Sequence, residues 1–251
     1  MAEINPNIIM FLEDLPFFKG LDHQIISDIL KNSTIHAYDK GQGILHNGDT
    51  ATRLFVILNG WIKLYRTTEE GDEAIIGLLT RGDIFGETTV FTDGIHKYSV
   101  EAAEKSKIIE IPLALMRNYA ESNNEIMCRI MKLMSREMHK LQMENEHMVL
   151  MSASQRVGCL LLQLSSGMKG EGGVFSFPFE KSLAAARLGM KPETFSRALS
   201  QLKDFGVSVK GNEVSINSFK CLAGFACGHC SADLQGCQGA KRKECLGKGC
   251  N

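Results

Sequence analysis

The sequence has no long hydrophobic run. Its longest apolar stretches, at 74–79 and 158–162, fall well short of the about 18 residues that a membrane-spanning helix needs. The N-terminus also lacks the basic segment and the small-residue cleavage site of a secretory signal peptide. We therefore expect a cytoplasmic protein without a membrane partner.

Catalytic motifs are missing as well. The sequence contains no phosphate-binding Walker loop, no paired-carboxylate motif and no nucleophile–base arrangement. Of its 251 residues, 44% are hydrophobic and 23% are charged, which is the balance of a chain that folds around buried cores. The length favours two domains. We predict a binding protein and not an enzyme.

Cysteine is scarce until the last 31 residues, which hold six of the eight cysteines. In a reducing compartment such a cluster indicates metal ligation before it indicates disulfides. The tight turn between Cys227 and Cys230 places two thiolates together, and the glycines around it let the backbone wrap a metal. The predicted metal ligands are Cys221, Cys227, Cys230 and Cys237.

These cysteines do not by themselves identify the metal. Four thiolates suit a zinc ion or a four-iron cluster, and we favour an iron–sulfur cluster, with zinc and an unliganded tail as the alternatives. Cys245 and Cys250 would then be spare or resolving thiols. His229 lies inside the cysteine pair and not after it, so the tail has no covalent haem attachment motif, and haem is the least supported cofactor.

Between residues 34 and 111, short segments rich in Val, Ile, Phe and Tyr alternate with glycines, which predicts a β-roll or sandwich. Segments 53–58 and 61–66 flank Asn59-Gly60, a dipeptide typical of two-residue hairpin turns, so we expect them to pair. Ahead of the roll, 14–30 is predicted to be helical. Its apolar stripe consists of Leu21, Ile25, Ile26, Ile29 and Leu30.

A heptad repeat follows the roll. Apolar residues recur in alternating steps of four and three, which is the pattern of a coiled-coil seam, and Asn145 is its one polar member. A single Asn in a seam fixes two helices in register. We favour a dimer over a helix folded against its own sheet with methionines filling gaps. The seam consists of Met127, Met131, Met134, Met138, Leu141, Asn145 and Met148.

The segment 151–220 has the pattern of a winged helix-turn-helix. A short helix from Lys181 is followed by a tight turn at Gly189 and by a second helix with Pro192 at its first position. Two strands then flank Gly211-Asn212 and predict a hairpin, the wing.

Charge is unevenly distributed along the chain. Residues 1–111 carry 10 basic and 17 acidic side chains, whereas residues 181–210 carry six and two, within a net charge of −1. A concentrated basic stretch in a nearly neutral chain indicates a nucleic-acid contact, and a solvated basic face is the alternative.

In this order the motifs resemble those of the Crp/Fnr regulators, over about residues 12–220. The resemblance rests on 54–60, 70–73 and 82–94 in the roll and on 188–190 and 192–197 in the C-terminal part. It implies an α+β protein with double-stranded DNA, a second copy of the chain and RNA polymerase as partners. Its expected parts are a double-stranded β-helix (jelly-roll) sensor domain at 12–120, a dimerisation helix at 121–150, a winged helix-turn-helix at 151–220 and a Cys-rich tail at 221–251.

Glu193, Ser196 and Arg197 share one face at the start of the second helix. A carboxylate accepts from cytosine N4, and a guanidinium donates to guanine O6 and N7. This pattern is similar to the reader of a TTGAT-type half-site in the Fnr-like branch, and Pro192 stands where the cyclic AMP receptor branch has Arg. The predicted DNA phosphate contacts are Lys191, Lys203 and Lys210.

Cyclic AMP-binding members of the family use a Gly-Glu pair for the ribose and an Arg-Ser pair for the phosphate. Gly86 and Glu87 match the first pair, but Lys97 and Tyr98 stand in place of the second. Lysine lacks the two-pronged donor of arginine, and tyrosine crowds the phosphate. We therefore do not expect cyclic AMP to be the effector of this pocket.

The sequence thus predicts a homodimeric transcription regulator on a TTGAT-N4-ATCAA palindrome that responds to a redox, oxygen or nitric oxide signal. One alternative is a regulator that responds to a cyclic nucleotide. Another, from a different class, is a redox or metal-handling protein that acts through its Cys-rich tail.

Overall fold

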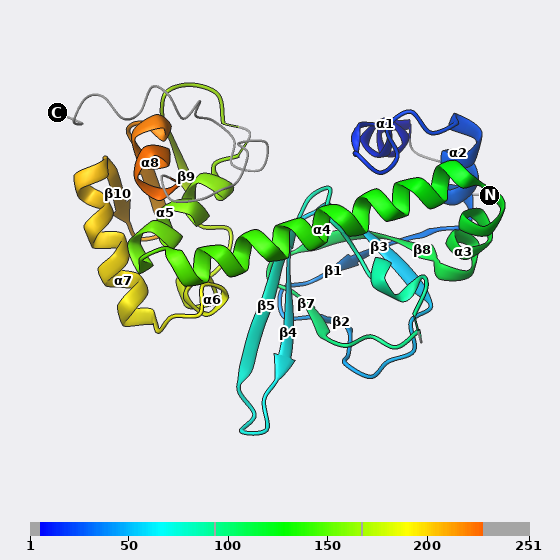
Figure 1. Cartoon of the computed structure of the whole chain (residues 1–251), viewed down its shortest axis with the longest axis horizontal. Helices are drawn as coiled ribbons and strands as arrows, with labels where there is room; N and C mark the ends of the chain where they lie inside the picture. Colours follow the sequence, from blue (N-terminus) through cyan, green and yellow to red (C-terminus); the bar gives the residue numbers. More distant parts are fainter. Residues whose placement is uncertain (1–5, 93, 167, 228–251) are drawn as a thin grey trace. The chain divides into compact units, whose positions relative to one another are not determined.

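The computed structural model describes residues 6–92, 94–166 and 168–227. The chain divides into two compact units, residues 1–138 and 139–251 (Figure 1). The first unit contains a β-roll and the second a winged helix-turn-helix, which confirms the predicted α+β class.

In the described part of the first unit, strands form two four-stranded antiparallel sheets. The first sheet has the order β1-β8-β3-β6, and the second has the order β2-β7-β4-β5. This is the jelly-roll arrangement that the sequence predicts. The strands are β1 (Thr34–Tyr38), β2 (Gly43–Leu45), β3 (Arg53–Asn59), β4 (Trp61–Thr67), β5 (Glu73–Thr80), β6 (Ile84–Phe85), β7 (Ser99–Ala102) and β8 (Ser106–Pro112).

The predicted hairpin across Asn59-Gly60 is wrong. Both strands form, but β3 pairs with β8 and β6 whereas β4 pairs with β5 and β7. Both edges of β3 are therefore occupied, and β4 crosses to the opposite sheet. Gly60 makes this corner with a φ of 98°, and a Cβ there would lie 2.7 Å from the Cα of Ser106. Gly60 does adopt the positive φ that the dipeptide predicts, but it does so at a corner where the chain passes from one sheet to the other.

β3 is buried on both faces, so it separates two apolar cores. Phe55 and Ile57 point into the core between the sheets, where Phe55 stacks on Phe85 with ring centroids 4.6 Å apart. Leu54 and Val56 belong to the core on the other side, where helices cover the first sheet. These helices are α1 (Pro6–Asp14), α2 (His23–Lys31), α3 (Leu113–Ser122) and the start of α4 (Asn124–Leu150).

The helix expected at 14–30 starts later than predicted. α1 ends at Asp14, and α2 begins only at His23, after a stretch of turns. Asp22 caps α2, since its carboxylate accepts a hydrogen bond of 2.8 Å from the Gln24 backbone N–H. The apolar stripe is a helical pattern from Ile25 onward, whereas Leu21 is buried from the preceding turn.

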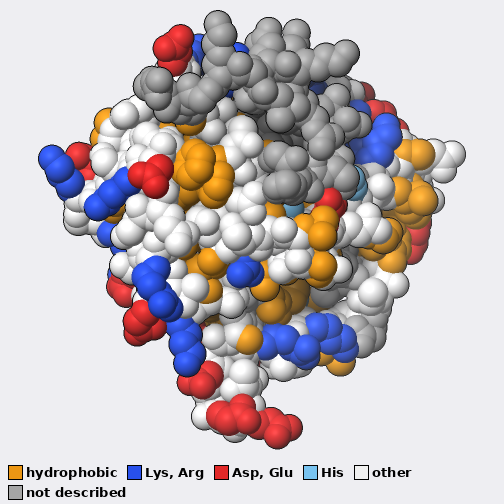
Figure 2. Space-filling view, turned by 60° about the vertical axis from the view of Figure 1, so that its left-hand side comes forward, with side chains coloured by type: hydrophobic (Ala, Val, Ile, Leu, Met, Phe, Trp, Pro, Cys, Tyr) orange, Lys and Arg blue, Asp and Glu red, His pale blue; other side chains and the backbone are white. Residues whose placement is uncertain are grey.

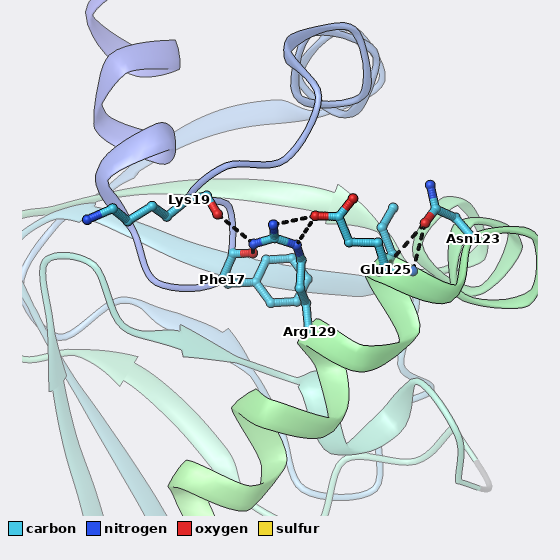
Figure 3. A network of polar contacts seen from close by, with 6 residues as sticks. Phe17, Lys19, Asn123, Glu125 and Arg129 are labelled. Atoms are coloured by element: carbon cyan, nitrogen blue, oxygen red, sulfur yellow. Dashed lines mark hydrogen bonds and ion pairs between the residues drawn. The ribbon is translucent and has the colours of Figure 1, made fainter.

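Arg129 fixes the first turns of α4 to the N-terminal segment (Figure 3). Its guanidinium donates to the backbone carbonyls of Phe17 at 3.0 Å and Lys19 at 2.8 Å. It also pairs with Glu125 one turn earlier, at 2.5 Å. Asn123 caps the helix start by accepting from the Glu125 backbone N–H at 2.9 Å. The beginning of α4 is thereby held in one place on the roll.

The second unit confirms the predicted helix-turn-helix and wing. β10 and β11 pair across Gly211-Asn212, and β9 adds a third strand to their sheet. α8 packs against α5, so the stretch expected to be a tail from residue 221 begins inside a packed helix. The elements are α5 (Ala153–Leu164), β9 (Gly173–Ser176), α6 (Lys181–Arg187), α7 (Pro192–Gln201), the 3-10 turn η2 (Leu202–Phe205), β10 (Val207–Lys210), β11 (Glu213–Ile216) and α8 (Phe219–Ala226).

None of the helices in the described ranges combines the length and hydropathy needed to cross a membrane.

We predict that Gly60→Ala destabilises the roll more than an equivalent change elsewhere. A positive φ costs a non-glycine residue about 1–2 kcal/mol, and the contact with Ser106 adds an overpacking cost of about 1–3 kcal/mol. Gly71→Ala is the control, since Gly71 has a φ of 91° with nothing within 4 Å. Urea unfolding should give the larger loss for Gly60→Ala, and equal losses would contradict the corner geometry.

Candidate DNA-binding surface and effector site

The turn of the helix-turn-helix depends on Gly189. This residue has a φ of 63°, and the backbone N–H of Met190 returns to the Ala185 carbonyl at 3.0 Å. α7 then begins at Pro192, whose missing N–H is harmless in the first turn. The positive φ of Gly189 and the proline at the first position of α7 thus fix where the second helix starts.

α7 has one buried face and one exposed face. Phe195, Ala198 and Leu199 are buried, and the Phe195 ring lies 6.3 Å from Phe177 in an edge-on contact. The three residues predicted to read bases are all exposed on the other side of the helix. They are Glu193, Ser196 and Arg197.

Glu193 and Arg197 are one turn apart and could have neutralised each other. Among the residues that the structure describes, however, no ion pair joins them. A carboxylate and a guanidinium are therefore available on one face, which is the donor and acceptor set needed to read a G·C pair from the major groove.

The predicted phosphate contacts Lys191, Lys203 and Lys210 are all exposed. Lys191 is the residue before α7, and Lys210 lies at the wing tip. In addition, the Lys181 ammonium at the start of α6 donates to the Gly211 carbonyl in the wing turn. This bond ties the wing to the helix-turn-helix.

Acidic side chains gather at the lower tip of the molecule in Figure 2, whereas Lys and Arg side chains are scattered over the face in view. The turn of the β4–β5 hairpin carries exposed Glu69, Glu70 and Asp72. Such a tip would be repelled by DNA phosphates.

Gly86 has a structural reason to be glycine. Its φ is 85°, and a Cβ there would lie 3.2 Å from the Arg53 carbonyl oxygen and 3.4 Å from the Phe55 ring. Glu87 follows it in a 3-10 turn, η1 (Glu87–Thr89). Gly86 is thus explained by the packing of the roll, whatever ligand the domain takes.

The structure brings Gly86, Glu87 and Tyr98 together. Burial, and after it the charge of Glu87, raise the pKa of Tyr98, while a hydrogen bond from the Gly86 backbone lowers it in part. A neutral phenol beside a carboxylate offers no positive charge to a cyclic phosphate. Lys97 is exposed, and the expectation that this is not a cyclic AMP site stays a prediction.

His96 is a site residue that sequence reasoning missed. It is 3% exposed, and its Nδ1 has no hydrogen-bond partner within the described ranges. Its ring lies 6.5 Å from Phe55 and 6.3 Å from Tyr98. Burial lowers the pKa of His96, and Asp49 opposes this. The available signal was its position directly before the 97–98 pair.

The predicted seam lies on α4, and most of it is exposed. Met131, Met138 and Leu141 are 64%, 60% and 61% exposed. Met134, Asn145 and Met148 are also exposed, whereas Met127 packs partly against the core of the roll. A continuous apolar stripe in contact with water is the signature of an interaction surface.

Two of the predicted metal ligands, Cys230 and Cys237, lie outside the described residues. Cys221 lies on α8 and is disulfide-bonded, and Cys227 is the residue that caps the end of that helix. Within the described part of the chain, no group of three or more His, Cys, Asp or Glu side chains could hold a metal ion.

Two family models match the chain. A cyclic nucleotide-binding domain matches residues 35–123, and a Crp-like helix-turn-helix domain matches residues 155–225. These ranges coincide with the roll and the winged unit.

The chain is also similar to curated regulators. Electron transport regulator A of Shewanella oneidensis is 31% identical over 202 residues, which cover 74% of this chain and 77% of the relative. The fumarate and nitrate reduction regulatory protein of Escherichia coli is 32% identical over 200 residues, which cover 76% and 77%.

Solved structures agree with these relatives. DNR from Pseudomonas aeruginosa is 27% identical with a TM-score of 0.52, covering 89% of this chain and 99% of that chain. FixK2 from Bradyrhizobium japonicum, at 20% identity, shares the fold with a TM-score of 0.69, over 77% and 96%. With a sensor roll, a long helix, a winged helix-turn-helix and relatives above 30% identity over most of its length, the chain belongs to the Crp/Fnr family of transcription regulators.

Proposed function

We propose that this regulator binds a TTGAT-N4-ATCAA palindrome as a homodimer, with Glu193, Ser196 and Arg197 reading the bases. The observation that carries the proposal is the exposed face of α7, where a carboxylate and a guanidinium lie one turn apart without pairing. Arg197 would grip a guanine through O6 and N7, and Glu193 would accept from a cytosine N4.

The signal is proposed to be redox, oxygen or nitric oxide. The names of the relatives support this, since they refer to electron transport and to fumarate and nitrate reduction. The environment of Tyr98 supports it as well, because it disfavours a cyclic phosphate. RNA polymerase is the proposed protein partner, as expected for a regulator of this family.

Replacing Arg197 should change specificity. Arg197→Ala should weaken binding to the palindrome by about 1–3 kcal/mol and relax the choice at one guanine. Lys203→Ala is the matched control on the same unit, and it should weaken all sequences alike and flatten the salt dependence. Titrations against cognate and single-substituted duplexes measure both effects. An unchanged specificity ratio in Arg197→Ala would remove Arg197 from base readout.

Dimerisation is proposed to bury the stripe on α4. Asn145 would face its counterpart in the second copy, which satisfies both amides and sets the register. No other apolar cover for Met131, Met138 and Leu141 exists among the described residues, since all three are more than half exposed.

A charge in the stripe should therefore break the dimer. Met138→Glu is expected to give a particle of 27.7 kDa by light scattering at micromolar concentration, whereas the unaltered chain gives twice that mass. Lys132→Glu, which places the same charge on the outer side of α4, should remain dimeric. A monomer for the unaltered chain even with cognate DNA would disprove the seam.

A cysteine-held redox cofactor is the further part of the proposal. Cys221 and Cys227 lie six residues apart along α8, about 9 Å of helix rise, whereas two sulfurs on one zinc ion lie within about 4.6 Å of each other. A shared zinc ion therefore fits poorly. A four-iron cluster, whose thiolates bind different irons, fits better, with Cys227, Cys230 and Cys237 as ligands and Cys221 as the fourth once reduced.

Metal analysis tests this cofactor. Protein purified without air and with a thiol reductant should contain iron, and a Cys227→Ser, Cys230→Ser double variant should have lost it. Cys128→Ser, an exposed cysteine on α4, is the control and should keep the metal. Equally negligible iron and zinc in all three proteins would reduce the tail to an unliganded extension.

A further inference from the structure

Three elements meet where α4 ends. Glu144 and Met148 are four residues apart and so share one face of the last turns of α4. Glu144 pairs with Arg187 at the end of α6. Nη1 of Arg156, in the first turn of α5, donates to the Met148 sulfur at 2.8 Å. The helix-turn-helix is thus attached to the end of α4 by two arginines from two different helices.

Arg156 also holds the turn itself. The same Nη1 donates to the Leu188 carbonyl at 3.0 Å, one residue before Gly189. A Cβ on Gly189 would lie 2.9 Å from the Met148 methyl, so the turn and the end of α4 pack closely. The Nε of Arg156 is buried without a hydrogen-bond partner among the described residues, so its guanidinium gives up hydration to reach this position.

The connection between α4 and α5 is short. Only Met151 and Ser152 separate the helices; Met151 is buried, and its N–H donates to the His147 carbonyl at 3.1 Å. Ser152 begins α5 with a capping box to Gln155. A short, capped connection transmits a rotation of α4 to the next helix instead of absorbing it.

Glu144 is not needed for the seam. In the heptad frame it takes a g position, and the e position five residues later, which would face it across a parallel dimer, is Val149. Its carboxylate therefore has no opposite charge across the dimer and is engaged by Arg187 instead.

We infer that Arg156 and Arg187 are positioning residues that lock the helix-turn-helix to the end of α4 and so set the half-site spacing that the dimer accepts. Each added base pair moves the second half-site by about 3.4 Å and rotates it by about 35°. A dimer with locked recognition helices discriminates between spacers, and a dimer with loosened ones does not. This inference rests on the proposed dimeric DNA-binding function.

The test compares spacers of three, four, five and six base pairs between the TTGAT half-sites, together with a duplex that holds a single half-site. In Arg187→Gln and Arg156→Met, the ratio of dissociation constants between the five- and four-pair spacers should fall about fivefold or more, in the range typical of coupled sites. Affinity for the single half-site should be unchanged. The double variant Glu144→Arg, Arg187→Glu should restore the ratio.

Arg136→Gln is the matched control, because Arg136 is exposed on the same helix and takes part in no described ion pair. It should behave as the unaltered chain. Both arginine variants keeping the original ratio, or the charge exchange failing to rescue it, would overturn the lock.

A second readout does not depend on DNA. Amide hydrogen exchange at 184–190 should be faster in Arg187→Gln and Arg156→Met than in the unaltered chain and in Arg136→Gln, with the thermal midpoint monitored alongside. Unchanged exchange would also overturn the lock. If the unaltered chain binds none of the duplexes while exchange responds as expected, the proposed DNA site is wrong and the lock stands.

Discussion

The apolar stripe on α4 is the constraint from which the rest of the molecule can be understood. Exposed apolar surface costs about 25 cal/mol for each Å² left in water, and Met131, Met138 and Leu141 are each about 60% exposed. The same helix of a second copy can cover this stripe, because the heptad places every member of the stripe on one side. A twofold axis along α4 then presents two copies of α7, which is why the proposed DNA site is a palindrome.

Arginines hold both ends of this helix. At its start, Arg129 donates to the backbone carbonyls of Phe17 and Lys19, so the N-terminal segment is fixed to α4 through main-chain atoms that no substitution removes (Figure 3). Near its end, Arg156 of α5 contacts the Met148 sulfur of α4 and also donates to the Leu188 carbonyl. Guanidinium groups suit this task because their donors are directional and stay charged.

Local sequence signals predicted the elements that depend little on distant parts of the chain. The heptad spacing predicted α4, Pro192 predicted the start of α7, and Gly211-Asn212 predicted the wing hairpin. Asn59-Gly60 failed because a local turn signal does not say whether a neighbouring edge is free, and β8 and β6 occupy both edges of β3. The burial of His96 could not be foreseen, since it depends on packing near Phe55, which comes from the distant strand β3.

The proposed sensing tail and the recognition helix share one neighbour, α5. Gly158 of α5 is in close contact with α8, since a Cβ there would lie 3.2 Å from Ala226 and from Leu222. Gln155 adds a hydrogen bond of 3.2 Å to the Phe225 carbonyl, and α5 also packs against α7. If the proposed cluster binds at Cys227, its loss would act on the last turn of α8. The packing of both α8 and α7 against α5 would then give a route to the recognition helix that needs no contact between cofactor and bases.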